Sequence, residues 1–505
     1  MTRRLPARPN LEHLKKQAKR LLRALEDPSP VTRERYRALF SRPVPEHPRL
    51  ADAHHALARE YGFASWTMLR SHVESVAAEA DPVAMLVTAI KTNDVSAARR
   101  ALERHPRLRE RLDDPLPGFD FGATPLIAAL PTGNRELIDL LLDSGADIHQ
   151  RSHWWAGGFG VLDGDHPLVR HLIERGARVD AHAAARHGML DELVRLVETD
   201  PTCVAARGGD GQTPLHVAAS VEIASLLLDH GADIDALDVD HESTPAQYLV
   251  RRRPEVTRFL VERGCRTDLL MLSALGDLER VRRHLDVDPE SIHMSVSETS
   301  FPKRDPRAGG TIYIWTLGAH RTAHVIAREF EHEDVLALLI ERSPAELRLA
   351  LACELGDEEA FAALLRSRPD LTRTLTEDDR RKLVFAAESD NTRAVRMMLA
   401  AGWPPDVRGQ RGGTPLHWAC WHGNVEMMRE ILRHRSVTET RDDDYGQTPL
   451  GWAMHGSLHG WHRDRGDYVT TVEGLLDAGA KAPRSVDGLE ASAEVLAVLR
   501  RRYDS

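Results

Sequence analysis

Three histidines near the C-terminus, His455, His459 and His462, have the spacing best suited to a metal site. Intervals of four and three residues place side chains on one face of a helix, and imidazole nitrogens are common ligands of Zn²⁺. Gly456 and Gly460 weaken a helix over this stretch, however, and no cysteine accompanies the histidines. We therefore expect no metal centre and no bound cofactor.

A second polar group, Asp238, Asp240, His241 and Glu242, is acidic enough to attract a cation. A calcium-binding loop needs oxygen ligands at fixed intervals, and that spacing is absent here. We interpret this group as the acidic tip of a turn.

Two further groups of titratable residues could serve an enzyme if the chain closes a pocket around them. The first lies beside residues 291–320 and the second within residues 455–468; they are His320, His324 and Glu329, and His459, His462 and Asp464. Either group would have to converge in a closed cleft to act. The sequence contains no GxSxG, HExxH or GxxxxGK[ST] motif, and Gly157-Gly158 and Gly309-Gly310 indicate loops only.

Self-similar segments position these residues. The sequence Thr-Pro-Leu-His-Val-Ala-Ala at 213–219 recurs as Thr-Pro-Leu-His-Trp-Ala-Cys at 414–420, and shorter copies begin at Thr124, Thr244 and Thr448. Apolar stretches that end in Gly-Ala-Asp or a variant lie between the copies. Thr213 and Thr244 are 31 residues apart, and Thr414 and Thr448 are 34 apart, which brackets a period of about 33.

Each residue type of the motif has a physical reason. The threonine hydroxyl can cap free N–H groups of the first helical turn, and proline suits the first helical position, where its missing N–H costs nothing. The leucine enters the core, and the small alanines let two antiparallel helices approach closely. A glycine after the second helix can adopt the left-handed conformation that ends it.

The two landmarks, recurring in order, resemble the ankyrin repeat. In that family the motif histidine hydrogen-bonds within and between repeats, a role that the resemblance assigns to His216 and His417. The framework residues are Thr124, Pro125, Thr213, Pro214, His216, Thr414, Pro415, His417, Thr448 and Pro449.

The resemblance implies an all-α fold, an ankyrin-repeat solenoid of stacked antiparallel helix pairs joined by short β-hairpins or loops. We expect a helical head at residues 1–80, a first repeat block at 81–290 and an insertion at 291–320. A second block at 321–482 and a closing helix within 483–505 follow, because the last repeat of an array needs a cap.

Two segments depart from the regular pattern. In the repeat at 211–236, Ser220 leads directly into Val221 without the usual glycine turn, so we expect an irregularity there. In the insertion, the β-branched and aromatic run Thr311–Thr316 predicts an extended strand or hairpin. After it, residues 321–324 stand where the motif should recur, and residues 151–160 read as a loop.

The head contains an amphipathic helix that begins after Asn10, with Leu11, Leu14, Ala18 and Leu21 on one face. Further helices are expected from Leu50 to Arg59 and from Ser65 to Val76, and the phrase at 59–66 is similar to the leader of many bacterial ankyrin proteins. Its basic residues are a solvated face or a contact for an acidic partner, lipid or nucleic acid; they are Arg3, Arg4, Arg8, Lys15, Lys16, Lys19, Arg20 and Arg23.

The resemblance also implies where a partner would bind, since ankyrin arrays line their concave face with turn tips and first helices. The exposed positions of the helix after Thr414 hold Trp418, Trp421 and His422, and the next repeat places Trp452 and His455 at the matching positions. We expect these five residues to form one aromatic patch. The enlarged segment 455–468 leaves two alternatives: an exposed binding surface, or tryptophans covered as private core.

Composition and charge narrow the fold and the class of partner. The chain has 505 residues, of which 42% are hydrophobic and only 5% aromatic, which favours thin helical layers over one large aromatic core. The net charge of −10 argues against nucleic acid as a partner. We expect a non-catalytic scaffold for a protein partner; the alternative is an enzyme with a pocket at 291–320 or 455–468.

The cysteines and the hydropathy of the chain bear on its cellular compartment. The four cysteines are far apart, which argues against a disulfide framework and fits a reducing compartment; they are Cys203, Cys265, Cys353 and Cys420. No stretch approaches the 18 uninterrupted apolar residues of a membrane span. We expect a cytoplasmic monomer.

Overall fold

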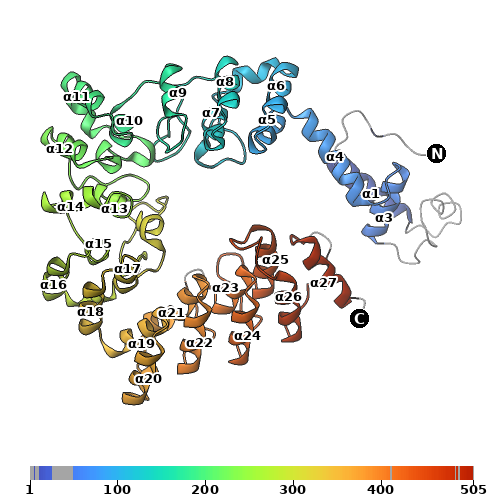
Figure 1. Ribbon diagram of the computed structural model, residues 1–505. Coiled ribbons are helices and arrows are strands. Elements are labelled where there is room, and N and C mark those ends of the chain that lie inside the picture. The colour runs from blue at the N-terminus through green and yellow to red at the C-terminus, as the bar shows by residue number, and fades with distance from the viewer. Residues whose placement is uncertain are drawn as a thin grey trace. The chain divides into compact units, whose positions relative to one another are not determined.

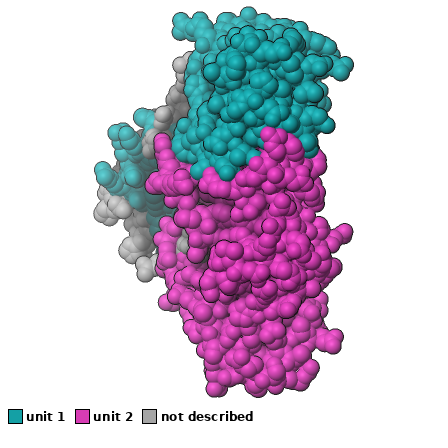
Figure 2. Space-filling model, turned by 90° about the vertical axis from the view of Figure 1, so that its left-hand side faces the viewer, with its two compact units in different colours: residues 1–241 teal, residues 242–505 magenta. Residues whose placement is uncertain are grey.

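The computed structural model describes residue 5 and residues 11–25, 49–409, 412–483, 485–486 and 489–503. These residues form helices and turns without strands, and their β pairing is limited to an isolated bridge between Ser295 and Thr322. The chain divides into two compact units, residues 1–241 and 242–505 (Figure 2). The all-α prediction is confirmed.

The described residues of the head form three helices, α1 (Leu11–Leu25), α3 (Leu50–Glu60) and α4 (Trp66–Ala80). The predicted apolar face of α1 is buried at Leu14, Ala18 and Leu21. Ser65 caps α4, because its Oγ accepts a hydrogen bond from the Met68 N–H at 3.2 Å. Asn10 and the basic residues Arg3, Arg4 and Arg8 lie outside the described residues.

The remaining described α-helices of the first unit include three packed pairs, α5 (Pro82–Lys91) with α6 (Val95–Arg104), α7 (Pro125–Ala129) with α8 (Arg135–Asp143), and α10 (Ala181–Arg186) with α11 (Leu190–Thr199). The other two, α9 (Val169–Glu174) and α12 (Val221–Asp229), follow segments that are not α-helical. The irregularity at 211–236 is confirmed: a single 3₁₀ turn, Pro214–Val217, replaces the first helix. Ser220 then caps α12 at once, because its Oγ accepts from the Ile223 N–H at 3.4 Å.

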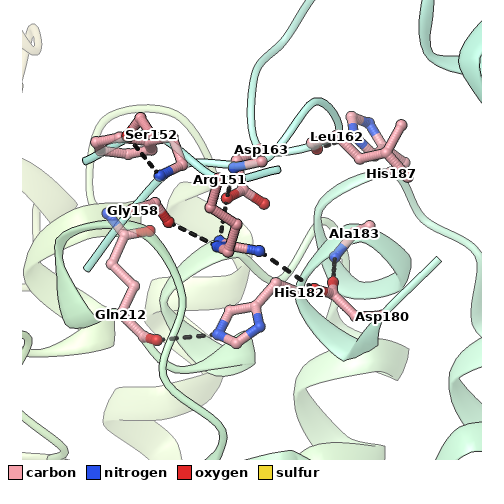
Figure 3. Close-up of polar contacts among 12 residues, drawn as sticks. Arg151, Ser152, Gly158, Leu162, Asp163, Asp180, His182, Ala183, His187 and Gln212 are labelled. Atoms are coloured by element: carbon pink, nitrogen blue, oxygen red, sulfur yellow. Dashed lines mark hydrogen bonds and ion pairs between the residues drawn. The ribbon is translucent and has the colours of Figure 1, made fainter. Parts of the chain in front are cut away.

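The loop at 151–160 is also confirmed, and polar contacts hold it (Figure 3). Arg151 donates from Nε to the Gly158 carbonyl at 2.8 Å and pairs with Asp163 and Asp180. A Cβ on Gly158 would lie 2.0 Å from the Ser152 carbonyl oxygen. Glycine is therefore required here by close packing of the backbone.

The second unit contains α13 (Pro245–Leu249), α14 (Pro254–Glu262), α15 (Leu269–Leu275), α16 (Leu278–Val287), α17 (Ala323–Glu329), α18 (Glu333–Arg342), α19 (Ala345–Leu355), α20 (Glu358–Ser367), α21 (Glu377–Glu388), α22 (Thr392–Ala401), α23 (Pro415–His422), α24 (Val425–Arg433), α25 (Pro449–His459), α26 (Tyr468–Asp477) and α27 (Ala493–Tyr503). From α15 to α25 each first helix contacts the next, and α22, α24 and α26 form a parallel row of second helices (Figure 1). Contacts therefore run between neighbours, as a solenoid requires.

The end of this unit is closed by α27, which packs on α26. Val495 and Leu499 are fully buried in the same core as the preceding repeats. Arg501 pairs with Glu473 at 3.3 Å on its outer side. The closing helix thus gives the last repeat the neighbour that it would otherwise lack.

In the described residues the connections between repeats are loops, one of the two forms expected, and the loop at residues 442–447 is closed by a hydrogen bond from the Asp442 N–H to the Gln447 carbonyl at 2.9 Å. One expectation about the insertion is wrong. The stretch Thr311–Thr316 is not extended: it turns into a π-helix at Ile314–Gly318, and the Thr316 N–H donates to the Ile312 carbonyl at 3.0 Å. It packs on the 242–268 region, where Tyr313 donates to Asp268 at 2.9 Å, and it finds no strand to pair with among the described residues.

The motif prolines occupy the first helical positions at Pro125, Pro214, Pro415 and Pro449. The motif threonines differ in their hydrogen bonds. Thr448 caps its helix by accepting from the Gly451 N–H at 3.4 Å, whereas Thr414 donates its N–H and hydroxyl to His417 Nδ1, at 3.1 and 2.9 Å. Thr213 and His216 repeat this second arrangement. Thr124 forms no such cap.

Candidate functional site

Four of the nine tryptophans gather at one place in the second unit. We call Trp418, Trp421, Trp452 and Trp461 the tryptophan cluster. The first two belong to α23, the third to α25, and the last to the enlarged segment 455–468. Because α23 and α25 are adjacent first helices, their matching positions meet directly.

The predicted juxtaposition within these two helices occurs. Trp418 and Trp452 each follow their motif threonine by four residues, and their ring centroids are 5.0 Å apart at an interplanar angle of 86°. Trp421 and His455 are stacked instead, with centroids 5.9 Å apart and an interplanar angle of 30°. All three indoles are half-buried, and both edge-to-face and stacked contacts stabilise an aromatic cluster.

Trp452 is fixed by the turn before its helix. Its Nε1 donates to Asp442 Oδ2 at 3.0 Å, and the same carboxylate accepts from the N–H groups of Tyr445 and Gln447. Burial opposes ionisation of Asp442, but these hydrogen bonds outweigh it and hold the pKa of Asp442 below its ordinary value. The indole is therefore positioned by a charged acceptor.

The enlarged segment combines both alternatives left open by the sequence. It lays Trp461 against Trp418, with ring centroids 5.7 Å apart and an interplanar angle of 28°, so it covers part of the helix surface. Yet Trp461 is itself 64% exposed. Solvent therefore still reaches one indole of the cluster, and the other three are only half-buried, so the tryptophans are not a private core.

Glycines and one tyrosine dock this segment on the end of α23. Tyr468 donates from Oη to the Trp421 carbonyl at 2.8 Å, and Asp467 N–H donates to the Gly423 carbonyl at 3.0 Å. A Cβ on Gly456 would lie 2.7 Å from the Trp421 carbonyl oxygen. The low helix propensity of Gly456 suggests that α25 should end there, but the helix continues. The missing side chain instead lets α25 pass close to α23.

The three histidines with metal-like spacing do not come together. His455 and His459 share a face of α25, with ring centroids 4.5 Å apart. His462 lies beyond the helix end and instead contacts His422, at 4.6 Å between centroids, and Asp390, at 3.3 Å from Nδ1 to Oδ2. The helix stops at His459, so the spacing of three residues is not carried on a helical face.

His422 was expected on the exposed aromatic patch, but it is only 2% exposed. Its Nε2 donates to the Glu388 carbonyl at 2.9 Å, and the ring lies 5.7 Å from Trp461 between centroids. Burial lowers the pKa of His422, although the Asp390 carboxylate opposes this effect. The expectation that a partner touches His422 directly is therefore wrong; the residue lies beneath the cluster.

Neither candidate catalytic group converges. His320 pairs with Glu388 at 3.1 Å, His324 is buried against the Ser343 hydroxyl at 2.8 Å, and Glu329 pairs with Arg251. In the second group, His459 lies beside His455, while the side chain of Asp464 is 93% exposed. Each residue has a different partner, so the described residues assemble no acid–base pair from either group.

Sequence reasoning missed two residues. Trp461 was not singled out, although an indole between Gly460 and a polar run signals a surface position. His182 is not among the motif histidines named from the sequence, yet its Nε2 donates to the Gln212 carbonyl at 2.9 Å, as His417 Nε2 does to the Gln447 carbonyl at 3.2 Å. The common interval of 30 residues was the signal available.

Comparisons with known proteins agree with this architecture. A family model of three ankyrin repeats matches residues 161–270 and 383–482, and a model of one ankyrin repeat matches residues 121–153. The chain is 36% identical over 83 residues to E3 ubiquitin-protein ligase XB3 of Oryza sativa subsp. japonica, which covers 16% of this chain and 18% of that protein. It is 31% identical over 152 residues to the human B-cell lymphoma 3 protein, which covers 26% and 33%.

Among solved structures, the human ASB11 ankyrin repeat domain is 17% identical and covers 61% of this chain and 100% of that chain, with a TM-score of 0.25. The matched segments span only 18% and 33% of the two curated relatives above. Separately, none of the helices in the described residues has the length and apolarity needed to cross a membrane.

Proposed function

The chain is an ankyrin-repeat protein, and from this premise we propose that it is a non-catalytic scaffold whose tryptophan cluster binds a protein partner. Ankyrin repeats indicate a protein-interaction domain. The finer proposal places the contact on the first helices and turn tips of residues 242–505, which form the concave side of such an array. It includes Trp418, Trp421, Trp452 and His455 of the predicted patch and adds Trp461.

One observation carries the proposal: Trp461 is 64% exposed although it stacks on Trp418. An indole loses little conformational entropy on binding and offers a large apolar face, which makes tryptophan a frequent anchor of interfaces. The neighbouring Trp452 is held by Asp442 before any partner arrives. A preorganised aromatic surface spends less free energy on ordering when it binds.

Charge and topology favour a protein over other partners. The net charge of −10 disfavours the phosphate backbone of nucleic acid, and the proposal takes the chain to act as a cytoplasmic monomer. The match to the rice E3 ligase covers only 83 aligned residues, 18% of that protein, so the proposal assigns no ligase activity to this chain. The separation of the two candidate catalytic groups supports a binding role over an enzyme.

Affinity capture from cytosol of the source cells, followed by mass spectrometry, tests this proposal. Three baits are compared: the wild-type chain, Trp461→Ala and Trp315→Ala. Trp315 is the matched control, because it is 75% exposed but lies in the insertion, apart from the cluster. We expect a partner that the wild-type and Trp315→Ala chains retain and that Trp461→Ala loses.

A second pair of variants, Trp418→Ala and Trp452→Ala, tests whether a variant loses the partner because a contact is removed or because the repeat array is disturbed. Both should weaken capture of the same partner while circular dichroism shows an intact helical array. If every specific partner is captured equally by all the cluster variants, the tryptophan cluster is not the binding surface.

A further inference from the structure

A second feature lies directly beneath the tryptophan cluster, where side chains from three successive repeats meet. Asp390 belongs to the turn between α21 and α22, His422 ends α23, and His462 belongs to the enlarged segment after α25. One potential ligand atom from each lies within 4.8 Å of the other two. All three residues belong to the second unit.

His422 has the hydrogen bonding of a metal ligand. Its Nε2 donates to the Glu388 carbonyl at 2.9 Å, which fixes the tautomer and leaves a lone pair on Nδ1. The residue is 2% exposed, and no donor among the described residues reaches Nδ1. A backbone carbonyl behind one imidazole nitrogen, with the other nitrogen directed forward, is the usual outer support of a metal-bound histidine.

Asp390 is held in the same way. Its Oδ1 accepts from Asn424 Nδ2 at 2.7 Å, and that amide also donates to Thr392 Oγ1 at 2.9 Å. The Oδ2 atom remains on the side of His462, 3.3 Å from its Nδ1. The carboxylate is therefore oriented from behind, with one oxygen available to a cation.

His462 completes the set and shows what binding would change. Its Nε2 lies 2.6 Å from Arg465 Nη2, and because arginine only donates, Nε2 accepts and Nδ1 carries the proton toward Asp390. Metal binding at Nδ1 by the neutral ring requires that the proton be carried on Nε2 instead. Nε2 could then no longer accept from Arg465, so this exposed side chain would have to move away.

We propose that His422, His462 and Asp390 bind a divalent transition metal ion of the zinc class. Two imidazole nitrogens and one carboxylate oxygen suit Zn²⁺, Co²⁺ or Ni²⁺ and leave a coordination position for water or a partner's side chain. The proposal is independent of the partner proposed above, and the ion would tie the enlarged segment, including Trp461, to two earlier repeats.

Titration of the full chain with Co²⁺, followed by its visible d–d absorption, tests this site, and competition with Zn²⁺ gives the affinity. We expect one equivalent bound to the wild-type chain and a loss of at least roughly 100-fold in affinity in His462→Gln and in Asp390→Asn. Asparagine tolerates the left-handed backbone of Asp390, whose φ is 56°, so this variant should still fold.

Two controls make the result specific. His455, His459 and Glu490 form a second, exposed group of potential metal ligands. The double variant His455→Gln, His459→Gln removes both histidines of that group and should bind Co²⁺ as the wild type does. Arg465→Ala should bind more tightly, because it removes both the competing donor to His462 Nε2 and a nearby positive charge. The proposal is overturned if the Co²⁺ signal survives in His462→Gln and Asp390→Asn, or if it is lost in the His455, His459 double variant. It is also overturned if the wild-type chain binds no Co²⁺.

Discussion

His417 joins two repeats through one imidazole ring: Nδ1 accepts from the Thr414 N–H at 3.1 Å, and Nε2 donates to the Gln447 carbonyl at 3.2 Å. The ring can do both only when it is neutral. Burial lowers the pKa of His417 to about 4, with the Gln447 carbonyl opposing the shift. The link between the repeats therefore depends on pH.

The first prediction concerns that dependence. The unfolded chain protonates this histidine near its ordinary pKa of 6.5 and the folded chain only near 4, so between these values the unfolded state binds more protons. Stability is then full above about pH 6.5 and is lost as the pH falls. His417 should account for a loss of about 2 kcal/mol between pH 7 and pH 5.

The variant His417→Gln isolates this contribution. Glutamine already occupies the same motif position at Gln247, where Oε1 accepts from the Thr244 N–H at 2.9 Å. Urea unfolding at pH 7 and pH 5 should show a smaller drop in the variant than in the wild type. Equal drops in both chains would mean that His417 does not titrate as its burial implies.

The repeat register was readable from the sequence because its residues act locally. Thr448 caps the turn that follows it and Pro449 starts the helix, so the type of each residue reports its own backbone position. The strand predicted at Thr311–Thr316 does not form, because β-branched and aromatic residues favour strands only when a partner strand is available. Here Tyr313 is buried against the 242–268 region, and tertiary packing decides the conformation.

The second prediction tests the loop of Figure 3. In Gly158→Ala the new Cβ would lie 2.0 Å from the Ser152 carbonyl oxygen, so the loop must shift. We expect a loss of about 1–3 kcal/mol in the free energy of unfolding. Gly164→Ala is the matched control, since its Cβ would meet only His166 Cδ2 at an ordinary 3.4 Å. Equal stability of the two variants would contradict the packing described.

The third prediction concerns Asp210, a buried carboxyl at a left-handed turn with φ of 54°. Burial raises the pKa of Asp210 to about 6, although His241 opposes the shift. The folded chain then holds the proton that the unfolded chain releases near pH 3.8, so stability is lost as the pH rises toward 6. This cost reaches about 3 kcal/mol at pH 7.

Asp210→Asn removes the charge and keeps the shape, and asparagine tolerates the left-handed conformation. We expect the variant to be more stable than the wild type by about 1–3 kcal/mol at pH 7 and equal to it near pH 4. Thermal unfolding at both pH values measures this. A variant that differs from the wild type by the same amount at the two pH values would show that the Asp210 carboxyl carries no such penalty.

The candidate site was only partly predictable, for a physical reason. Trp418 and Trp452 occupy matching positions of adjacent repeats, so the period alone brings them together. Trp461 and His462 lie outside the period, in a segment whose path depends on Gly456 and on Tyr468 reaching the Trp421 carbonyl. No spacing rule links His462 to Asp390, because the two meet through the fold and not along one helix.

The last prediction separates the tryptophans by their burial. Trp403 is 2% exposed, and its Nε1 donates to the Asp379 carbonyl at 3.0 Å, so Trp403→Ala should cost about 3–5 kcal/mol through the cavity and the unpaired carbonyl. Trp461 is 64% exposed and loses mainly its stacking on Trp418, so Trp461→Ala should cost about 0.5–1.5 kcal/mol. Urea unfolding followed by circular dichroism measures both. If Trp461→Ala destabilised the chain as much as Trp403→Ala, its indole would be a structural element of the last repeats, and loss of a partner in that variant could no longer be attributed to a lost contact.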